Sequence, residues 1–68
     1  MLIGGYRYRE GNVVQLVRGG QAHVVIWRGQ LEHRDARGRV WRSNVYRLDN
    51  KHWDCYHEEE LHSAWRWE

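Results

Sequence analysis

Four residues near the C-terminal end have side chains that can bind metals or support nucleophilic chemistry. They are His52, Cys55, His57 and His62, in the order H-x2-C-x-H-x4-H. This order does not match the paired-cysteine spacing that is typical of structural zinc sites. A bound ion would help a small core to fold, but histidines beside acidic neighbours are also ordinary polar surface residues. We therefore expect no metal site and no cofactor.

Cys55 is the only thiol in the chain. A nucleophilic cysteine needs a base close by, and on a strand Cys55 shares a face with His57, whereas His52 and Asp54 share the other face. Most cysteines in such a strand are small core residues. A chain of 68 residues is also too short to build a deep pocket of enzyme size. The sequence therefore predicts a protein that is not an enzyme.

Arginines are interleaved with aromatic residues in YRYR, VWR, VYR and WRW. Strand alternation sends the rings to one face and the arginines to the other, as in any strand with a buried aromatic side and a solvated basic side. If the arginines of several strands converge, they form a surface that binds nucleic-acid phosphates. The candidate basic face consists of Arg7, Arg9, Arg28, Arg39, Arg42 and Arg47.

The chain has five tryptophans and four tyrosines but no phenylalanine. Large aromatic side chains bury much area, so most of them are expected to enlarge a small core. Tryptophan is also enriched at binding hot spots, and the candidate aromatic anchors are Trp41, Trp65 and Trp67. The predicted core draws on Val14, Leu16, Val25, Trp27, Val40, Tyr46 and Trp53.

Charge is distributed unevenly along the chain, although the formal net charge is only +2. Residues 1–47 hold nine arginines against three acidic residues, a charge of +6, and residues 48–68 hold two cations against six acidic residues, a charge of −4. Ten of the eleven cations are arginine, which suits bidentate contact with phosphate or carboxylate. The basic part therefore favours an anionic partner, and the acidic part is expected to be a solvated cover.

The number of domains, the solubility and the location of the protein are inferred from its length and from patterns that the sequence lacks. One cysteine allows no intramolecular disulfide, and the first residues do not show the pattern of a secretion signal. No apolar run approaches the roughly 20 residues of a transmembrane helix. We expect a soluble cytoplasmic protein with one domain, residues 1–68.

Alternating apolar runs separated by turn signals predict a small all-β fold. We expect a five-stranded, strongly bent antiparallel SH3-like barrel with a short C-terminal helical turn that starts near Glu58. An antiparallel sheet packed by one C-terminal helix is the alternative. Bulges are expected at Gly29 and at residues 43–44, turns at residues 10–12, 19–22, 35–38 and 49–51, and a last short strand or helical extension at residues 64–68. The expected strands cover residues 2–9, 13–18, 23–28 with an extension to 34, 39–48 and 52–57.

Two segments resemble known small β proteins. REGNVVQLVRGG resembles the opening of KOW-type and other SH3-like barrels, and WDCYHEEEL is similar to the endings of short bacterial YodC-like proteins. Gln21 replaces the proline that usually follows the Gly-Gly pair, and residues 30–51 match neither pattern. The resemblance implies a non-catalytic binding fold, and KOW-type domains contact RNA or transcription and ribosomal proteins.

A thin core, abundant tryptophan and an acidic segment beside a basic one favour a surface that binds a protein partner or a second copy of the chain. The expected function is therefore a small non-catalytic binding module that acts through protein–protein interaction, as an accessory protein from a phage or mobile element would. The alternative is a nucleic-acid-binding module that uses the arginine-rich face. A homodimer is also expected, because exposed tryptophans favour symmetric association.

Overall fold

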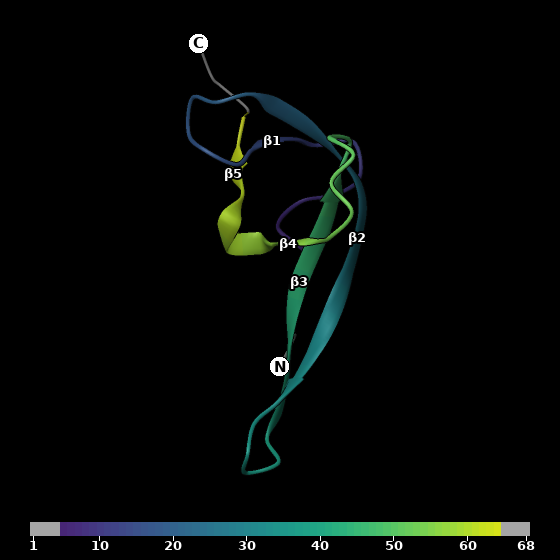
Figure 1. Cartoon of the computed structure of the whole chain (residues 1–68), viewed down its shortest axis with the longest axis vertical. Helices are drawn as coiled ribbons and strands as arrows, with labels where there is room; N and C mark the ends of the chain where they lie inside the picture. Colours follow the sequence, from purple (N-terminus) through teal and green to yellow (C-terminus); the bar gives the residue numbers. More distant parts are fainter. Residues whose placement is uncertain (1–4, 65–68) are drawn as a thin grey trace.

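The computed structural model describes residues 5–64 and shows an all-β protein. Five antiparallel strands form one sheet in the order β4-β3-β2-β1-β5, with a single 3₁₀ turn, η1, between β4 and β5 (Figure 1). β4 and β5 are at the two ends of this strand order, so closure into a barrel stays a prediction. The elements are β1 (Val13–Gln15), β2 (Ala22–Arg34), β3 (Val40–Leu48), β4 (Tyr56–His57), η1 (Glu58–Glu60) and β5 (His62–Ser63).

The longest feature is the β2–β3 hairpin, whose far end projects from the rest of the molecule (Figure 1). Its register runs without interruption from the pair Trp27–Arg47 to the pair Arg34–Val40. The turn at residues 35–38 is the one that the sequence predicts. Gly38 adopts φ +82°, which favours glycine. No helix within residues 5–64 has the length and apolar character of a membrane span.

The turn is stabilised by the carboxylate of Asp35. Its Oδ1 atom accepts hydrogen bonds from the backbone N–H groups of Arg39 and Arg37, both at 2.9 Å. The hydrogen bond from the Arg39 backbone is the largest cause that holds the pKa of Asp35 below its usual value, and it outweighs the opposing effect of desolvation. An aspartate in this position therefore fixes where β2 ends and β3 begins.

The core lies on one face of the sheet and is centred on Tyr46. The ring of Tyr46 is fully buried and meets the rings of Tyr8 and Tyr6 edge-on, at centroid distances of 5.5 and 6.2 Å. Tyr6, Leu16 and Tyr56 pack at its margin. The buried residues of this cluster are Tyr8, Val14, Val25, Tyr46, Leu48 and Leu61.

The predicted core is confirmed for Val14, Val25 and Tyr46, and Leu16 packs against it. The prediction is wrong for Trp27, Val40 and Trp53, whose exposed fractions are 44%, 48% and 79%. Trp27 follows a register shift after Val25, which turns it away from the core. Val40 lies near the projecting end of the hairpin, and Trp53 lies in the loop between β3 and β4.

Several predicted strand limits also need correction. Residues 5–9 are not a strand, although Tyr6 and Tyr8 do turn inward and Arg7 and Arg9 outward, as the alternation predicts. The strand expected at residues 52–57 is confined to Tyr56–His57, because the preceding segment forms a loop with φ +67° at Lys51. Within the described residues the chain forms a further strand, His62–Ser63, which the sequence does not predict, whereas the element expected at residues 64–68 lies, apart from Ala64, outside the described residues. Trp65 and Trp67 lie outside the described residues.

Neither bulge lies where the sequence suggests. Residues 43–44 pair regularly with Leu31 and Gln30, and the irregularity falls between Val25 and Trp27. Gly29 instead makes room for the indole of Trp27, because a Cβ atom at Gly29 would lie 2.3 Å from Cη2 of that ring. Val45, the register partner of Gly29, is buried outside the main core cluster.

Gly29→Ala is therefore expected to displace the Trp27 ring and to lower the free energy of unfolding by about 1 kcal/mol, the lower end of the usual cost of overpacking, because the displaced ring is partly exposed and can move. Urea denaturation followed by circular dichroism measures the change. Gly5→Ala is the matched control, because a Cβ atom there meets nothing within 4 Å. Equal stability of the two variants would contradict this role of Gly29.

Candidate binding hairpin

The net charge of the protein is concentrated on the outer part of the hairpin, residues 31–42, which we call the distal hairpin. Its four arginines and two acidic residues give a formal charge of +2, equal to that of the whole chain. The other seven cations are balanced by the other seven acidic residues. The arginines are Arg34, Arg37, Arg39 and Arg42, and the acidic residues are Glu32 and Asp35.

Three of these arginines form ion pairs within the distal hairpin. Nε of Arg39 lies 2.7 Å from Oδ2 of Asp35, and Glu32 lies 3.4 Å from Arg34 and 3.8 Å from Arg42. All three arginine side chains are well exposed. Exposed ion pairs contribute about 0–1 kcal/mol, so these guanidinium groups can exchange their carboxylate partners for an external anion at little cost.

The structure brings together only part of the candidate basic face. Arg39 and Arg42 belong to the distal hairpin, whereas Arg28 turns toward the body: its Nη1 donates to the Tyr8 carbonyl at 3.1 Å, and its guanidinium lies 4.4 Å from the centre of the Tyr6 ring. Arg7 and Arg9 lie in the N-terminal segment, and Arg47 lies farther along β3. Arg34 and Arg37 were not among the predicted residues of the basic face, although the segment RDARGRVWR shows their clustering.

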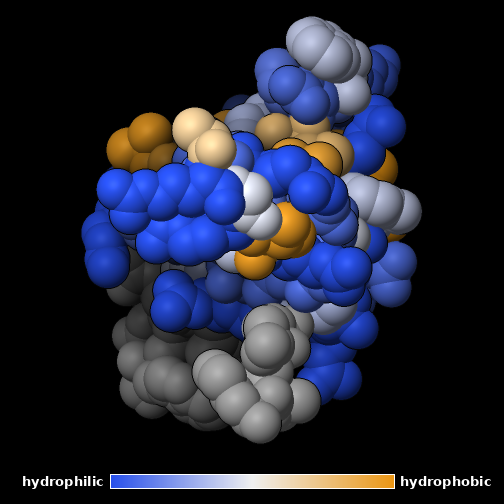
Figure 2. All heavy atoms as spheres, turned by 90° about the horizontal axis from the view of Figure 1, so that it is seen from below, coloured by the Kyte–Doolittle hydropathy of each residue, from blue (hydrophilic) through white to orange (hydrophobic). Residues whose placement is uncertain are grey.

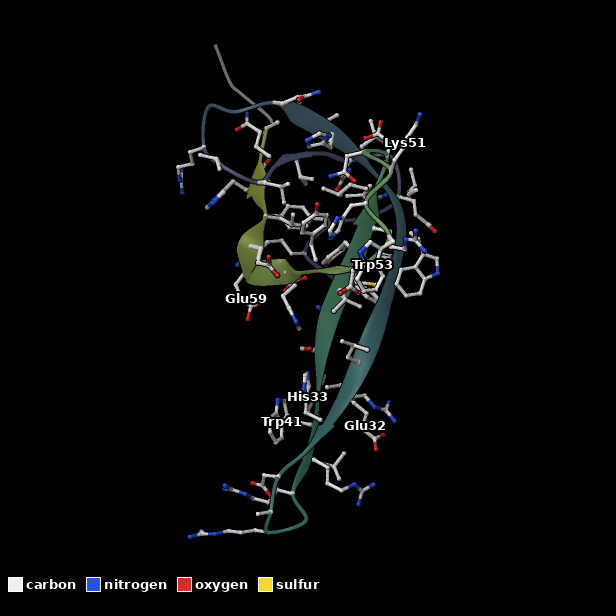
Figure 3. The ribbon with its side chains drawn as sticks, viewed as in Figure 1. Glu32, His33, Trp41, Lys51, Trp53 and Glu59 are labelled. Carbon is white, nitrogen blue, oxygen red and sulfur yellow. The ribbon has the colours of Figure 1, made fainter. Side chains whose placement is uncertain are left out.

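Trp41 and His33 form a stacked pair on the distal hairpin. They face each other across β2 and β3, their ring centroids are 5.2 Å apart, and their planes differ by 15°. Nε2 of His33 lies within hydrogen-bond distance, 2.7 Å, of Oγ of Ser43. The two rings lie on one side of the hairpin and Glu32 on the other (Figure 3). His33 was not among the predicted site residues, although its position two residues before the turn implies pairing with Trp41.

A hollow of about 470 Å³ is lined by Gln30, Val40, Trp41 and Arg42; apart from Trp41, these residues share the face of Glu32. Trp41 itself remains 51% exposed. Seen from the side of the hairpin turn, the surface is mostly hydrophilic with separate hydrophobic patches (Figure 2). The distal hairpin thus presents an accessible ring next to cationic groups.

The predicted chemical residues of the C-terminal region are dispersed. His52 stacks on Tyr56, with ring centroids 4.9 Å apart, and His57 lies near His33, at 6.4 Å. Cys55 lines a separate hollow of about 320 Å³ with Ile26, Trp27 and Arg47. Within residues 5–64, no three histidine, cysteine or acidic side chains are placed to hold one metal ion.

Glu58 joins the N-terminal segment, β3 and η1, a role that no local pattern indicates. Its Oε2 atom accepts hydrogen bonds from the Arg7 backbone N–H at 2.8 Å, from Nδ2 of Asn44 at 3.0 Å and from the hydroxyl of Tyr46. Partial burial opposes the charged form of Glu58, but these hydrogen bonds outweigh it and lower the pKa of Glu58. Burial, followed by the bond to Glu58, raises the pKa of Tyr46 to about 12. This network is structural, and the residues named here lie outside residues 31–42.

Comparison with protein-family models, with curated proteins and with solved structures finds no match to the chain.

Proposed function

We propose that this protein is a non-catalytic binding module that contacts nucleic acid through the distal hairpin. The observation that supports this most is the charge distribution: the projecting arm has a charge of +2 and the rest of the chain sums to zero. The excess positive charge that attracts a uniformly anionic ligand is therefore on this arm. We therefore place nucleic acid ahead of a protein partner, the reverse of the order that composition favours.

The chemistry of the arm suits a sugar–phosphate backbone. Its cations are all arginine, whose planar guanidinium can form two parallel hydrogen bonds with one phosphate. A two-stranded antiparallel ribbon is also narrow enough to enter the major groove of B-DNA. Contacts of this kind supply affinity without reading sequence, so we expect binding that depends strongly on salt and weakly on sequence.

Arg37→Gln/Arg39→Gln is expected to weaken the salt dependence of binding to a fluorescent duplex. Each phosphate contact adds about −0.9 to the slope of log K against log salt concentration. The double variant should therefore reduce the magnitude of the slope by up to about 1.8, measured by fluorescence anisotropy between about 50 and 200 mM salt.

Arg9→Gln/Arg18→Gln is the matched control, because it removes the same charge from exposed positions outside the distal hairpin. If both double variants change the slope equally, the salt dependence reflects the total charge of the protein and not the position of the arginines. That result would contradict the proposal that the distal hairpin contacts the nucleic acid. Absence of oligonucleotide binding by the parent protein would refute the proposed function.

A protein partner is the second candidate, favoured by the hollow that contains Ile26, Trp27, Arg47 and Cys55. Ile26 and Trp27 are exposed there, and tryptophan beside arginine is typical of interface hot spots. If the parent protein binds no oligonucleotide, capture of partners from its native host, compared between the parent and an Arg47→Gln variant, tests this candidate. The expected homodimer, the cytoplasmic location and a mobile-element origin likewise stay predictions.

A further inference from the structure

We infer that Trp41 is a stacking platform for an unpaired base, so that the preferred ligand is a single-stranded nucleic acid. This inference rests on the proposed function and adds which form of nucleic acid is bound and which side chain binds it. Aromatic side chains beside arginines are the usual means of binding single strands without sequence preference, because every base has a face that can stack.

The ring of Trp41 is held in place before any ligand arrives. Ser43 bonds to His33 at 2.7 Å, and His33 in turn stacks on Trp41 with nearly parallel planes. All three residues lie on paired strands, which restricts the backbone as well. A ring that is already oriented loses little conformational freedom when a base stacks on it, and this favours affinity.

The surroundings of Trp41 also fit a nucleotide. Trp41 is half exposed, and it borders a hollow of about 470 Å³ whose other lining residues, Gln30, Val40 and Arg42, share the face of the hairpin opposite His33. Arg42 follows Trp41 in the chain and pairs with Glu32 on the opposite side of the hairpin, and Arg39 is two residues before Trp41. A base stacked on Trp41 would thus have arginines within two residues along the chain that are available to its flanking phosphates.

The requirement for an open ring face separates single strands from duplexes. In a duplex the bases stack on each other and their faces are occupied, so Trp41 could reach one only after a base is extruded, which costs a few kcal/mol. In a single strand the faces are accessible. The arginines, in contrast, can contact phosphates of both forms.

Trp41→Ala is expected to weaken binding to a fluorescent oligothymidylate by about 5- to 150-fold, the loss of one base–aromatic stack. Binding to a duplex of the same length should change by less than about twofold.

Trp41→Tyr should retain most of the affinity for the single strand, because it keeps an aromatic face. Ser43→Ala should weaken it less than Trp41→Ala does. Trp53→Ala, which removes a more exposed indole from the loop between β3 and β4, is the matched control and should have no effect. Circular dichroism and thermal melting confirm that each variant is folded.

The possible results separate this inference from the proposed function. Loss confined to the single strand supports both. If Trp41→Ala leaves oligothymidylate binding unchanged, or weakens single strand and duplex equally, while Arg37→Gln/Arg39→Gln weakens both, the stacking inference is overturned and the proposed function stands. If the parent protein binds neither form, the proposed function and the inference both fail.

Discussion

Tyr46→Ala is expected to yield a protein that is mostly unfolded at room temperature. Tyr46 is fully buried, contacts two other tyrosine rings edge-on, and shares its hydroxyl in hydrogen bonds with Glu58 and the backbone of Tyr8. Truncation of a large buried aromatic side chain to alanine costs about 3–5 kcal/mol. A core in a chain this short rarely supplies more than about 3–5 kcal/mol in total. Circular dichroism and urea denaturation measure the loss.

The control for this prediction is Trp53→Ala, which removes a larger ring. Trp53 is exposed in the loop between β3 and β4, so this variant should melt like the parent protein. Tyr46→Phe should fall between the two, because it keeps the ring and leaves Glu58 without one donor. A Tyr46→Ala variant with the parent's denaturation midpoint would show that the core is not centred on this residue.

Glu58→Ala is expected to lower the free energy of unfolding by about 1.5–3 kcal/mol, the range for hydrogen bonds to a charged group. The substitution removes the common acceptor of Arg7, Asn44 and Tyr46. Glu59→Ala is the matched control, because Glu59 lies next to it in the same 3₁₀ turn and is exposed. Urea denaturation of both variants at neutral pH measures the difference, and equal losses would contradict the network.

The same network predicts how stability depends on pH. The folded-state pKa of Glu58 lies below its usual 4.5, so its contribution is complete above that value and disappears as the pH falls through the folded-state pKa. The stability gap between the parent protein and Glu58→Ala should therefore close in acid. The contribution of Tyr46 to stability depends on pH in the opposite direction. The pKa of Tyr46 is raised from 10.0 to about 12, so this contribution is complete below pH 10 and is lost as the pH rises toward 12.

Turns and side-chain orientations that depend on residues close in sequence were predicted correctly from local patterns. The turn at residues 35–38 follows from an aspartate and a glycine at the right spacing, and the alternation of Tyr6 and Tyr8 with arginines indicated which side chains turn inward. Val14 and Val25 were predicted as core residues because their runs carry apolar residues on both faces, and both are buried.

Features that depend on distant partners could not be predicted in this way. Alternation tells which residues share a face, but not how far the neighbouring strands extend, so Val40 was assigned to a core that ends before reaching it. The bond between Arg7 and Glu58 joins residues 51 positions apart. The candidate site could be predicted only in part. The pairing of His33 with Trp41 follows from the position of the turn, whereas the inward rotation of Arg28 depends on residues distant in sequence.

The position of the net charge has a consequence for the way in which an encounter begins. A molecule whose excess charge is at one end of its long axis experiences a torque in the field of a polyanion, and that torque turns the charged end toward it. The protein would thus approach nucleic acid with the hairpin turn leading. Added salt would slow association by screening this orientation, whereas the lifetime of the complex would be set by the contacts formed after docking.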